Sequence, residues 1–132
     1  MYTVMQVCRK LDMTYQTLKY YCNEGLVPHV KRDANNRRVF DERDVKWIRD
    51  LTCLKKCGMS IQEMKEYPEL CLQGEATILP RKEMLAKKQQ ALRASIRELE
   101  ASVAYIDWKQ HFYDDVLSGK TPYVSNLIGT EK

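Results

Sequence analysis

Two consecutive segments decide the fold: T-Y-Q-T-L-K-Y-Y-C-N-E-G-L-V-P at residues 14–28 and H-V-K-R-D-A-N-N-R-R-V-F-D-E-R-D-V at residues 29–45. Thr14 is a favoured helix N-cap, because its hydroxyl can accept a hydrogen bond from a free backbone N–H of the first turn. Gly25 supplies the left-handed stop, and the proline three positions later prevents the helix from resuming. The first segment therefore predicts a helix over residues 15–24.

The second segment predicts a tight basic hairpin. Asn35 and Asn36 tolerate positive φ, so they can form the turn between K-R-D and R-R-V-F. Asp41 can then cap a further helix. A capped helix, a hairpin and a return into another helix form the outline of a winged helix-turn-helix, which makes DNA binding the first hypothesis.

Positive charge gathers on this hairpin, at Lys31, Arg32, Arg37 and Arg38, with Asp33 as the opposing charge. Residues 1–58 hold 12 Lys/Arg against 7 Asp/Glu, whereas residues 59–132 hold 10 against 11, so the positive net charge of the chain, +4, comes entirely from the N-terminal part. A basic head and a neutral remainder suit contact with phosphates. The alternative is a charged surface that only keeps the protein soluble.

A short helix is expected before these segments. Thr3 can cap it, and its apolar residues follow the i, i+3, i+4, i+7 rule at Val4, Val7, Cys8 and Leu11. Only L-D-M-T separates it from the helix over residues 15–24, a connection short enough for a helix-turn-helix. The second helix of such a pair is the candidate for the DNA major groove.

Two more helices are expected after the hairpin. The first covers residues 42–57, with Asp41 as its cap. The pattern S-I-Q-E at residues 60–63 is a capping box for a short fourth helix. Pro68 closes that helix, so the segment P-E-L-C-L-Q-G-E-A-T, which begins there, is expected to be a loop.

Residues 80–117 have no glycine or proline in their interior and predict one long helix of roughly 57 Å. Apolar residues recur along it by sevens, as in a coiled coil. These seam positions are Leu85, Leu92, Ile96, Leu99, Val103 and Ile106. A small head cannot cover so long a stripe, so a homodimer is expected, and an intramolecular packing is the alternative.

The expected fold is mainly α. It has a winged helix-turn-helix DNA-binding domain at 1–75, a coiled-coil dimerisation helix at 76–118 and a tail at 119–132. Neither a signal peptide nor a run of about 18 apolar residues occurs, so a cytoplasmic protein without a membrane partner is expected. Five cysteines in that compartment argue for free thiols. No cofactor and no resident metal are expected.

The order of these motifs resembles the MerR family of bacterial transcription regulators. The motifs are T-L-K-Y-Y-x-x-x-G-L-x-P, R-R-V-F-D-E-R-D-V, G-M-S-I-Q-E-M and the terminal helix, and the match spans residues 1–117. The resemblance implies a homodimer, paired through antiparallel long helices, on a pseudo-palindromic promoter element whose spacer is too long. It also implies that an effector makes the dimer bend and undertwist this DNA so that RNA polymerase engages.

The resemblance also assigns single positions: Lys19 replaces the usual arginine, Tyr20 and Tyr21 match a tyrosine pair, and Arg38 matches the wing arginine. The sequence departs from the family pattern at Cys22, Asn36 and Arg37, where an acidic residue, a glycine and a tyrosine are common. These departures leave the fold intact and affect the detail of the wing.

The expected DNA contacts form two sets. Those near base edges or the adjacent backbone are Thr14, Tyr15, Gln16 and Lys19. Those that hold phosphates are Tyr20, Arg32, Arg37 and Arg38. Tyr21 lies on the apolar side of its helix, where core packing is the stronger expectation.

The stretch C-L-K-K-C-G-M-S-I, residues 53–61, resembles the branch of the family that responds to aldehydes, nitrosothiols and related electrophiles. In that branch a cysteine at the position of Cys53 is the reactive thiol, and the position of Cys57 is usually threonine. Helical geometry independently places Cys53 on the polar side of its helix, beside cations that favour a thiolate. The alternative is that Cys53 is a bystander. Cys8 and Cys22 are expected to be buried.

Other effectors and other classes of protein stay open. A soft metal would need a site built from Cys53, Cys57 and Cys71. A hydrophobic or cationic drug would use the aromatic residues Tyr105, Trp108, Phe112 and Tyr113. An effector-free architectural DNA-binding protein is a different class. An enzyme such as a thiol oxidoreductase is not expected, because the cysteine spacing is C-x-x-x-C and the βαβ pattern of such folds is absent.

Overall fold

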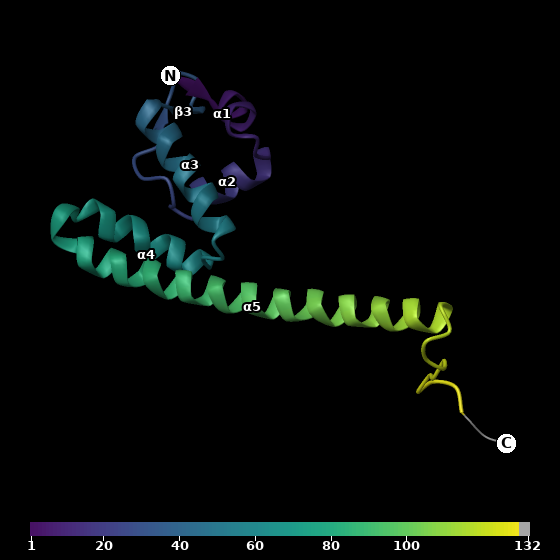
Figure 1. Ribbon diagram of the computed structural model, residues 1–132. Coiled ribbons are helices and arrows are strands. Elements are labelled where there is room, and N and C mark those ends of the chain that lie inside the picture. The colour runs from purple at the N-terminus through teal and green to yellow at the C-terminus, as the bar shows by residue number, and fades with distance from the viewer. Residues whose placement is uncertain (130–132) are drawn as a thin grey trace. The chain divides into compact units, whose positions relative to one another are not determined.

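The computed structural model describes residues 1–129 of the chain, which are mainly helical with one small sheet (Figure 1). The elements in order are β1 (Tyr2–Thr3), α1 (Val4–Leu11), α2 (Tyr15–Asn23), β2 (Lys31–Arg32), β3 (Arg38–Phe40), α3 (Glu42–Lys56), α4 (Ile61–Leu72), the 3-10 helix η1 (Gly74–Thr77) and α5 (Ile78–Leu117). Two compact units share them: Met1–Leu92, and the described residues from Arg93 onward.

The helix-turn-helix forms where the sequence places it. Thr3 and Gln6 make a reciprocal capping box at the start of α1, in which each side-chain oxygen accepts from the other residue's backbone N–H. The Thr14 hydroxyl oxygen accepts from the backbone N–H of Thr17, 3.1 Å away, and so begins α2. Gly25, at a φ of 76°, stops the chain after α2. The predicted extent of both helices is confirmed to within one residue.

A three-stranded antiparallel sheet in the order β1-β3-β2 carries the wing. Strand β3 pairs with β2, with Arg32 opposite Arg38, and the wing turn is closed by the N–H of Asn36, which donates to the Asp33 carbonyl over 3.0 Å. Asn35 and Asn36 lie in the turn, as predicted, and of the two residues that tolerate positive φ only Asn36 adopts it, at 59°. Strand β1, only two residues long, was not predicted.

Helix α4 continues through Pro68 to Leu72, and η1 begins two residues later at Gly74. The prediction that Pro68 closes the helix and opens a loop was therefore wrong. A proline inside a helix removes one backbone hydrogen bond and usually bends or ends it. Here Pro68 is buried, and its neighbour Tyr67 stacks on Trp47 with ring centroids 6.4 Å apart. Packing of α4 against α3 thus offsets the local cost of the proline.

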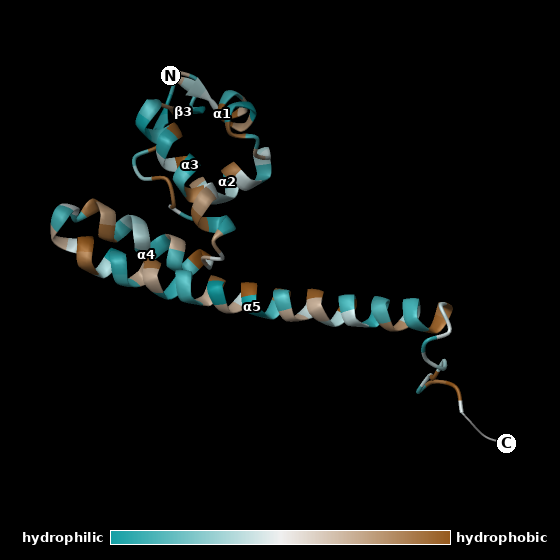
Figure 2. Cartoon of the chain, viewed as in Figure 1, coloured by the Kyte–Doolittle hydropathy of each residue, from teal (hydrophilic) through white to brown (hydrophobic). Residues whose placement is uncertain are grey.

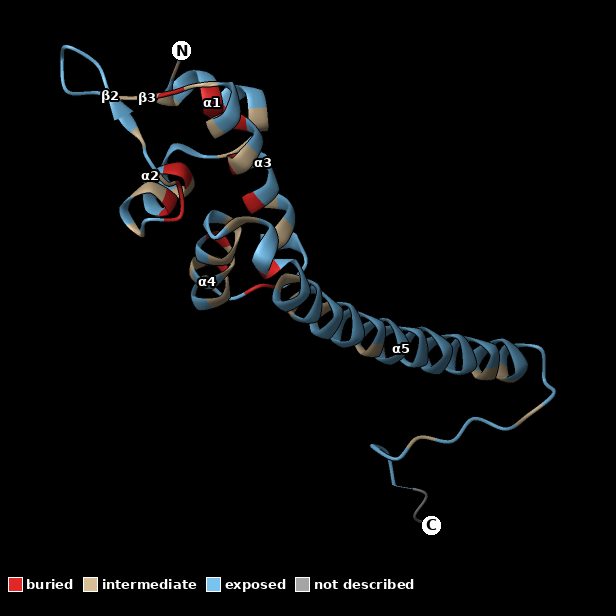
Figure 3. Ribbon diagram, turned by 90° about the vertical axis from the view of Figure 1, so that its left-hand side faces the viewer, coloured by how far each residue is buried: buried red, intermediate tan, exposed pale blue. Residues whose placement is uncertain are grey.

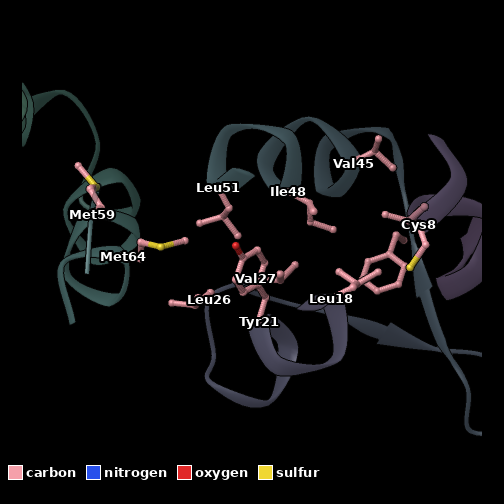
Figure 4. Close-up of a cluster of buried hydrophobic side chains, with 12 residues drawn as sticks. Cys8, Leu18, Tyr21, Leu26, Val27, Val45, Ile48, Leu51, Met59 and Met64 are labelled. Carbon is pink, nitrogen blue, oxygen red and sulfur yellow. The ribbon is translucent and has the colours of Figure 1, made fainter. Parts of the chain in front are cut away.

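The core of the first unit is formed by side chains of α1, α2, β3, α3 and the start of α4, and Figure 4 shows how they converge. Helix α3 contributes Val45, Ile48 and Leu51, each at most 1 % exposed. Complete burial of such a side chain contributes about 1.5–3 kcal/mol. Figure 3 shows buried residues confined to this unit. The core therefore packs α3 against the helix-turn-helix.

Helix α5 runs for 40 residues and contains no buried residue. It begins at Ile78, two residues before the predicted start, because a proline is tolerated in the first turn of a helix. The seam residues are exposed at fractions from 39 % at Leu85 to 68 % at Val103. Figure 2 shows apolar residues spaced along an otherwise polar helix. None of the helices within residues 1–129 combines the length and apolarity needed to cross a membrane.

Candidate nucleic-acid interface and thiol positions

A hollow of about 510 Å³ lies between α1, α2 and the wing. Five of the eight predicted DNA-contact residues line it: Tyr15, Lys19, Arg32, Arg37 and Arg38. Its lining also includes the apolar residues Val4, Met5 and Leu18. The fold therefore gathers cations from α2 and from both arms of the hairpin around one concave surface.

The other three predicted DNA-contact residues are placed differently. Gln16 and Tyr20 are exposed on α2, and Tyr20 shows 44 % of its surface. Thr14 has its hydroxyl engaged, because it accepts from Thr17 as an N-cap and donates to the Thr17 hydroxyl over 2.8 Å. Thr14 is thus a structural residue of α2 first, and a contact through its side chain would compete with the cap.

The wing is ordered by its own polar groups. The Asp33 carboxylate accepts from the backbone N–H groups of Asn35, at 2.9 Å, and Arg37, at 3.0 Å. The Arg32 guanidinium donates to the Asn36 carbonyl over 3.0 Å. Asp33 looked from the sequence like a charge opposing the basic patch, and the structure makes it the organiser of the turn.

Two contacts fix the wing to neighbouring helices. The Arg38 guanidinium donates to the side-chain oxygen of Asn23 at the end of α2, 2.6 Å away. Lys31 forms an ion pair of 2.8 Å with Asp41, the N-cap of α3. The Lys31 ammonium and the Asp44 N–H lower the pKa of Asp41 to about 2. The sequence did not predict the contacts of Asn23 with Arg38 and of Asp41 with Lys31, because no local sequence pattern indicates either pair.

Cys53 and Cys57 are both exposed on α3. Residue 57 is the C-cap of the helix, and its N–H donates to the Cys53 carbonyl over 3.1 Å. At about 100° per residue, Lys46, Arg49 and Cys53 share the side of α3 that faces away from its core residues. The predicted accessibility of Cys53 is confirmed.

The other three cysteines differ in setting. Cys8 is buried, as predicted, whereas Cys22 is only half-buried and lines the hollow beside the wing. Burial raises the pKa of both thiols, and Arg38 and Arg32 partly counter this effect at Cys22. Cys71 accepts a 3.9 Å contact from the Arg81 guanidinium on its sulfur.

The soft-metal site considered from the sequence would need Cys53, Cys57 and Cys71 to converge on one ion. Among residues 1–129, no three His, Cys, Asp or Glu side chains are grouped closely enough to hold a metal ion. Cys71 lines a separate hollow of about 180 Å³ with Trp47, Pro68 and Leu72. The structure thus does not bring Cys71 together with Cys53 and Cys57.

The aromatic residues of the second unit form a row along α5. Tyr105 stacks on Trp108 at 6.3 Å, and Trp108 on Phe112 at 6.1 Å between ring centroids. Phe112 is tilted against Tyr113 at 5.7 Å. Trp108 remains 62 % exposed. These rings are placed to pack on one another along a single helix.

A helix-turn-helix with a basic wing on its flank defines a winged DNA-binding regulator. The family model of the MerR HTH family regulatory protein matches residues 2–69, and the chain belongs to this family. A transcriptional regulator of Haemophilus influenzae, named as uncharacterised, is 32 % identical over 112 residues, which are 85 % of this chain and 83 % of that protein. The regulator AdhR of Bacillus subtilis is 39 % identical over 89 residues, and the chain spans 64 % of its length.

Solved structures agree with the family. HiNmlR, described as a MerR family regulator lacking the sensor domain and bound to promoter DNA, matches with a TM-score of 0.74 at 31 % identity. That match covers 89 % of this chain and 93 % of HiNmlR. A MerR family protein of Listeria monocytogenes matches with a TM-score of 0.79 at 27 % identity, over 90 % of each chain. The protein is therefore a DNA-binding transcriptional regulator and not an enzyme.

Proposed function

We propose that the protein is a homodimeric regulator that binds a pseudo-palindromic promoter and changes its geometry when an electrophile or oxidant modifies Cys53. The observation that carries the sensing part is the position of Cys53, exposed on α3, whose N-cap Asp41 is bonded to Lys31 of the wing. One helix therefore connects the candidate sensor thiol to the candidate DNA surface.

The hollow beside the wing is the proposed seat of the DNA backbone. Arg32, Arg37 and Arg38 hold phosphates there, and Tyr20 adds a hydroxyl from the exposed side of α2. Gln16, Tyr15 and Lys19 approach base edges or the adjacent sugar-phosphate. Phosphate contacts fix the orientation of a protein on duplex DNA, while base contacts give it sequence preference. The promoter-bound relative HiNmlR supports this use of the fold.

The exposed seam of α5 is the proposed dimer contact. Leu85, Leu92, Ile96, Leu99, Val103 and Ile106 are all at least 39 % exposed. A heptad stripe of this kind is buried when two helices pair. Two heads on one dimer then meet two half-sites of a palindrome, as symmetric regulators do. The protein acts on cytoplasmic DNA, and RNA polymerase is its partner through the reshaped promoter.

Modification at Cys53 supplies the switch. A thiol on the outer side of α3 is reachable by a small electrophile without opening the core. An adduct there adds bulk or removes a nucleophile beside Lys46 and Arg49, and it shifts α3 relative to its surroundings. Through Asp41 the shift reaches the base of the wing. Cys57, one turn later, is a second exposed thiol that can take part in the same chemistry.

The test compares wild type with Cys53→Ser in purified transcription from a promoter with an extended spacer, with and without an aldehyde. The expected result is unchanged operator affinity and lost induction in the variant. An unchanged response in Cys53→Ser removes this thiol from the mechanism. A soft metal ion as the inducer in a parallel arm tests the alternative effector. DNA binding without any effect on transcription would instead identify an architectural protein.

A further inference from the structure

Two exposed thiols lie one helical turn apart at the C-terminal end of α3. Cys53 and Cys57 are four positions apart in the chain, so their side chains leave α3 on the same side. Helical residues at this spacing have Cβ atoms about 5–6 Å apart. A small reagent that reaches one thiol from solvent therefore also reaches the neighbourhood of the other.

The two thiols differ in how firmly the backbone holds them. Cys53 lies within the continuous turns of α3, whereas Cys57 is the C-cap, so no helical residue follows it. The Cys57 N–H is shared between the carbonyls of Cys53 and Leu54, each 3.1 Å away. Gly58 comes next at a φ of 88°, and a glycine adopts other backbone conformations at little steric cost. The end of α3 can therefore move at Cys57 while the rest of the helix stays in place.

The spacing of the two thiols sets a condition on any bond between them. A disulfide brings its Cβ atoms to about 3.5–4.5 Å, so an intact last turn leaves the pair about 1–2 Å too far apart. The bond forms only if Cys57 leaves its helical position and its N–H gives up the carbonyls of the preceding turn. Disulfides that are strained or exposed are more easily reduced than structural ones, and this is typical of regulatory bonds.

We infer that Cys53 and Cys57 form a reversible disulfide within one chain when a hydroperoxide oxidises Cys53, and that this bond unwinds the last turn of α3. The inference rests on the proposed function, and it assigns an oxidant class and a separate role to each thiol. Cys53 is the residue that meets the oxidant. Cys57 is the residue that resolves the oxidised product.

The chemistry takes two steps. The Cys53 thiolate attacks one oxygen of the hydroperoxide, the O–O bond breaks, and an alcohol or water leaves after taking up a proton. The product is a sulfenic acid at Cys53. The Cys57 sulfur then attacks the sulfenic sulfur, an S–S bond forms, and water leaves with the Cys57 proton. The two thiols together lose two electrons, and the hydroperoxide gains them.

Unwinding at Cys57 reaches two other helices through Gly58. The Gly58 carbonyl lies 3.4 Å from the ammonium of Lys88 on α5, and the same ammonium forms a 2.8 Å ion pair with Glu63, the capping-box residue of α4. When the last turn of α3 opens, Lys88 loses the carbonyl and keeps Glu63. The disulfide thus releases α3 where α4 and α5 meet it, whereas an adduct on Cys53 alone leaves this contact in place.

The first test maps the bond in the full chain. Hydrogen peroxide should remove two of the five free thiols. Trypsin cleaves after Lys55 and Lys56, so the disulfide should hold the peptides of Cys53 and Cys57 together until a reductant separates them, in protein that runs as a monomer on a non-reducing gel. Cys71→Ser is the matched control and should give the same linked pair. A wild-type link to Cys71, or a link found only between chains, would overturn the inference.

The second test follows the intermediate. In Cys57→Ser the oxidation should stop at the sulfenic acid of Cys53, which dimedone traps and mass spectrometry locates. In wild type the same treatment should give little trapped product, because Cys57 consumes the sulfenic acid. Equal trapping in the two proteins would show that Cys57 does not resolve Cys53.

Hydrogen exchange measured by mass spectrometry tests the unwinding. The N–H groups of residues 57, 58 and 59 donate to carbonyls within the last turns of α3 in the reduced protein. They should exchange faster in the oxidised protein and return to the original rate after reduction, while residues 45–51 keep their rate. Unchanged exchange at residues 57–59 in protein that carries the disulfide would refute the unwinding.

Transcription from a promoter with an extended spacer separates this inference from the proposed function. Cys57→Ser should still respond to an aldehyde, because one thiol is enough for an adduct. It should lose the response to hydrogen peroxide that wild type shows and that a reductant reverses. Equal peroxide responses in wild type and Cys57→Ser would overturn the inference and leave the proposed function standing. A Cys53→Ser protein that responds to both reagents as wild type does would refute the proposed function itself.

Discussion

The ammonium of Lys31 lies 2.8 Å from a carboxylate oxygen of Asp41, which ties the outgoing strand of the wing to the first turn of the helix that carries Cys53. The other oxygen of the same carboxylate accepts from the Asp44 N–H at 2.8 Å as an N-cap. Exposed ion pairs contribute little to stability on their own. The importance of this pair is geometric, since one side chain both starts α3 and holds the wing.

The pH dependence of unfolding should report on this carboxylate. The pKa of Asp41 is lowered from 3.8 to about 2, first by Lys31 and then by the Asp44 N–H. The folded state therefore favours the charged form of this carboxylate. The stabilisation that the charged Asp41 gives is complete above pH 3.8 and is lost as the pH falls towards 2. Asp41→Asn should be less stable at neutral pH and show a flatter acid limb in urea denaturation. Asp50→Asn on the same helix is the control, and equal acid limbs in wild type and Asp41→Asn would contradict the assignment.

Asn23 should position Arg38 for DNA. In Arg38→Ala a phosphate contact is lost, so affinity falls and the slope of log affinity against log salt decreases by about 1. In Asn23→Ala the guanidinium charge remains but its fixed orientation is lost, so affinity falls while the salt slope stays as in wild type. Fluorescence anisotropy with labelled operator DNA over a salt series separates the two. Identical slopes in all three proteins would remove Arg38 from the phosphate contacts.

The stability of the protein should depend on which residue occupies position 36 in the wing turn. Asn36 has a φ of 59°, a left-handed conformation that glycine adopts freely and alanine adopts at a cost of about 1 kcal/mol. Asn36→Gly should leave the stability near wild type, and Asn36→Ala should lower it by about 1 kcal/mol in urea denaturation. Asn35→Ala is the matched control, since Asn35 needs no positive φ. A larger loss in Asn35→Ala than in Asn36→Ala would contradict this account of the turn.

Truncation of isomeric side chains should separate folding from association. Ile48 is fully buried in α3, and Ile48→Ala should cost about 2–5 kcal/mol of unfolding free energy. Leu99 is 66 % exposed on α5, and Leu99→Ala removes the same number of atoms. That change should leave the first unit as stable as in wild type and weaken the dimer instead. Calorimetry of the first unit's transition and sedimentation measure the two effects, and a Leu99→Ala protein that dimerises like wild type would place the contact elsewhere.

The helices of the first unit follow from local signals. Thr3, Thr14, Asp41 and Ser60 each accept the capping hydrogen bond that their residue type predicts. The end of α4 was predicted wrongly at Pro68, because the rule that proline ends a helix considers only local sequence. The packing of α4 on Trp47 outweighs that rule here. Strand β1 was not predicted because two residues are too few to show the alternating pattern of a strand.

The candidate site was predictable only in its composition. Basic and aromatic residue types at the wing and on α2 indicated a DNA surface. Their pairing did not follow from spacing, because Arg38 meets Asn23 and Lys31 meets Asp41 across 15 and 10 positions of the chain. Such contacts depend on how the hairpin folds back over α2 and α3. The net positive charge of residues 78–97 and the net negative charge of residues 98–117, by contrast, can be read from the sequence once the extent of α5 is known.

Trp47 gives the protein an internal optical reporter. Its indole N–H donates to the Leu26 carbonyl over 2.8 Å, and its ring stacks on Tyr67 of α4. One chromophore thus senses the segment after α2, the helix α3 and the helix α4 at the same time. Trp108 is 62 % exposed, so its emission should lie at longer wavelength than that of a shielded indole, and Trp108→Phe removes it. The emission of Trp47 then becomes a label-free record, in real time, of any shift of α3 against its neighbours when a thiol reagent or DNA is added.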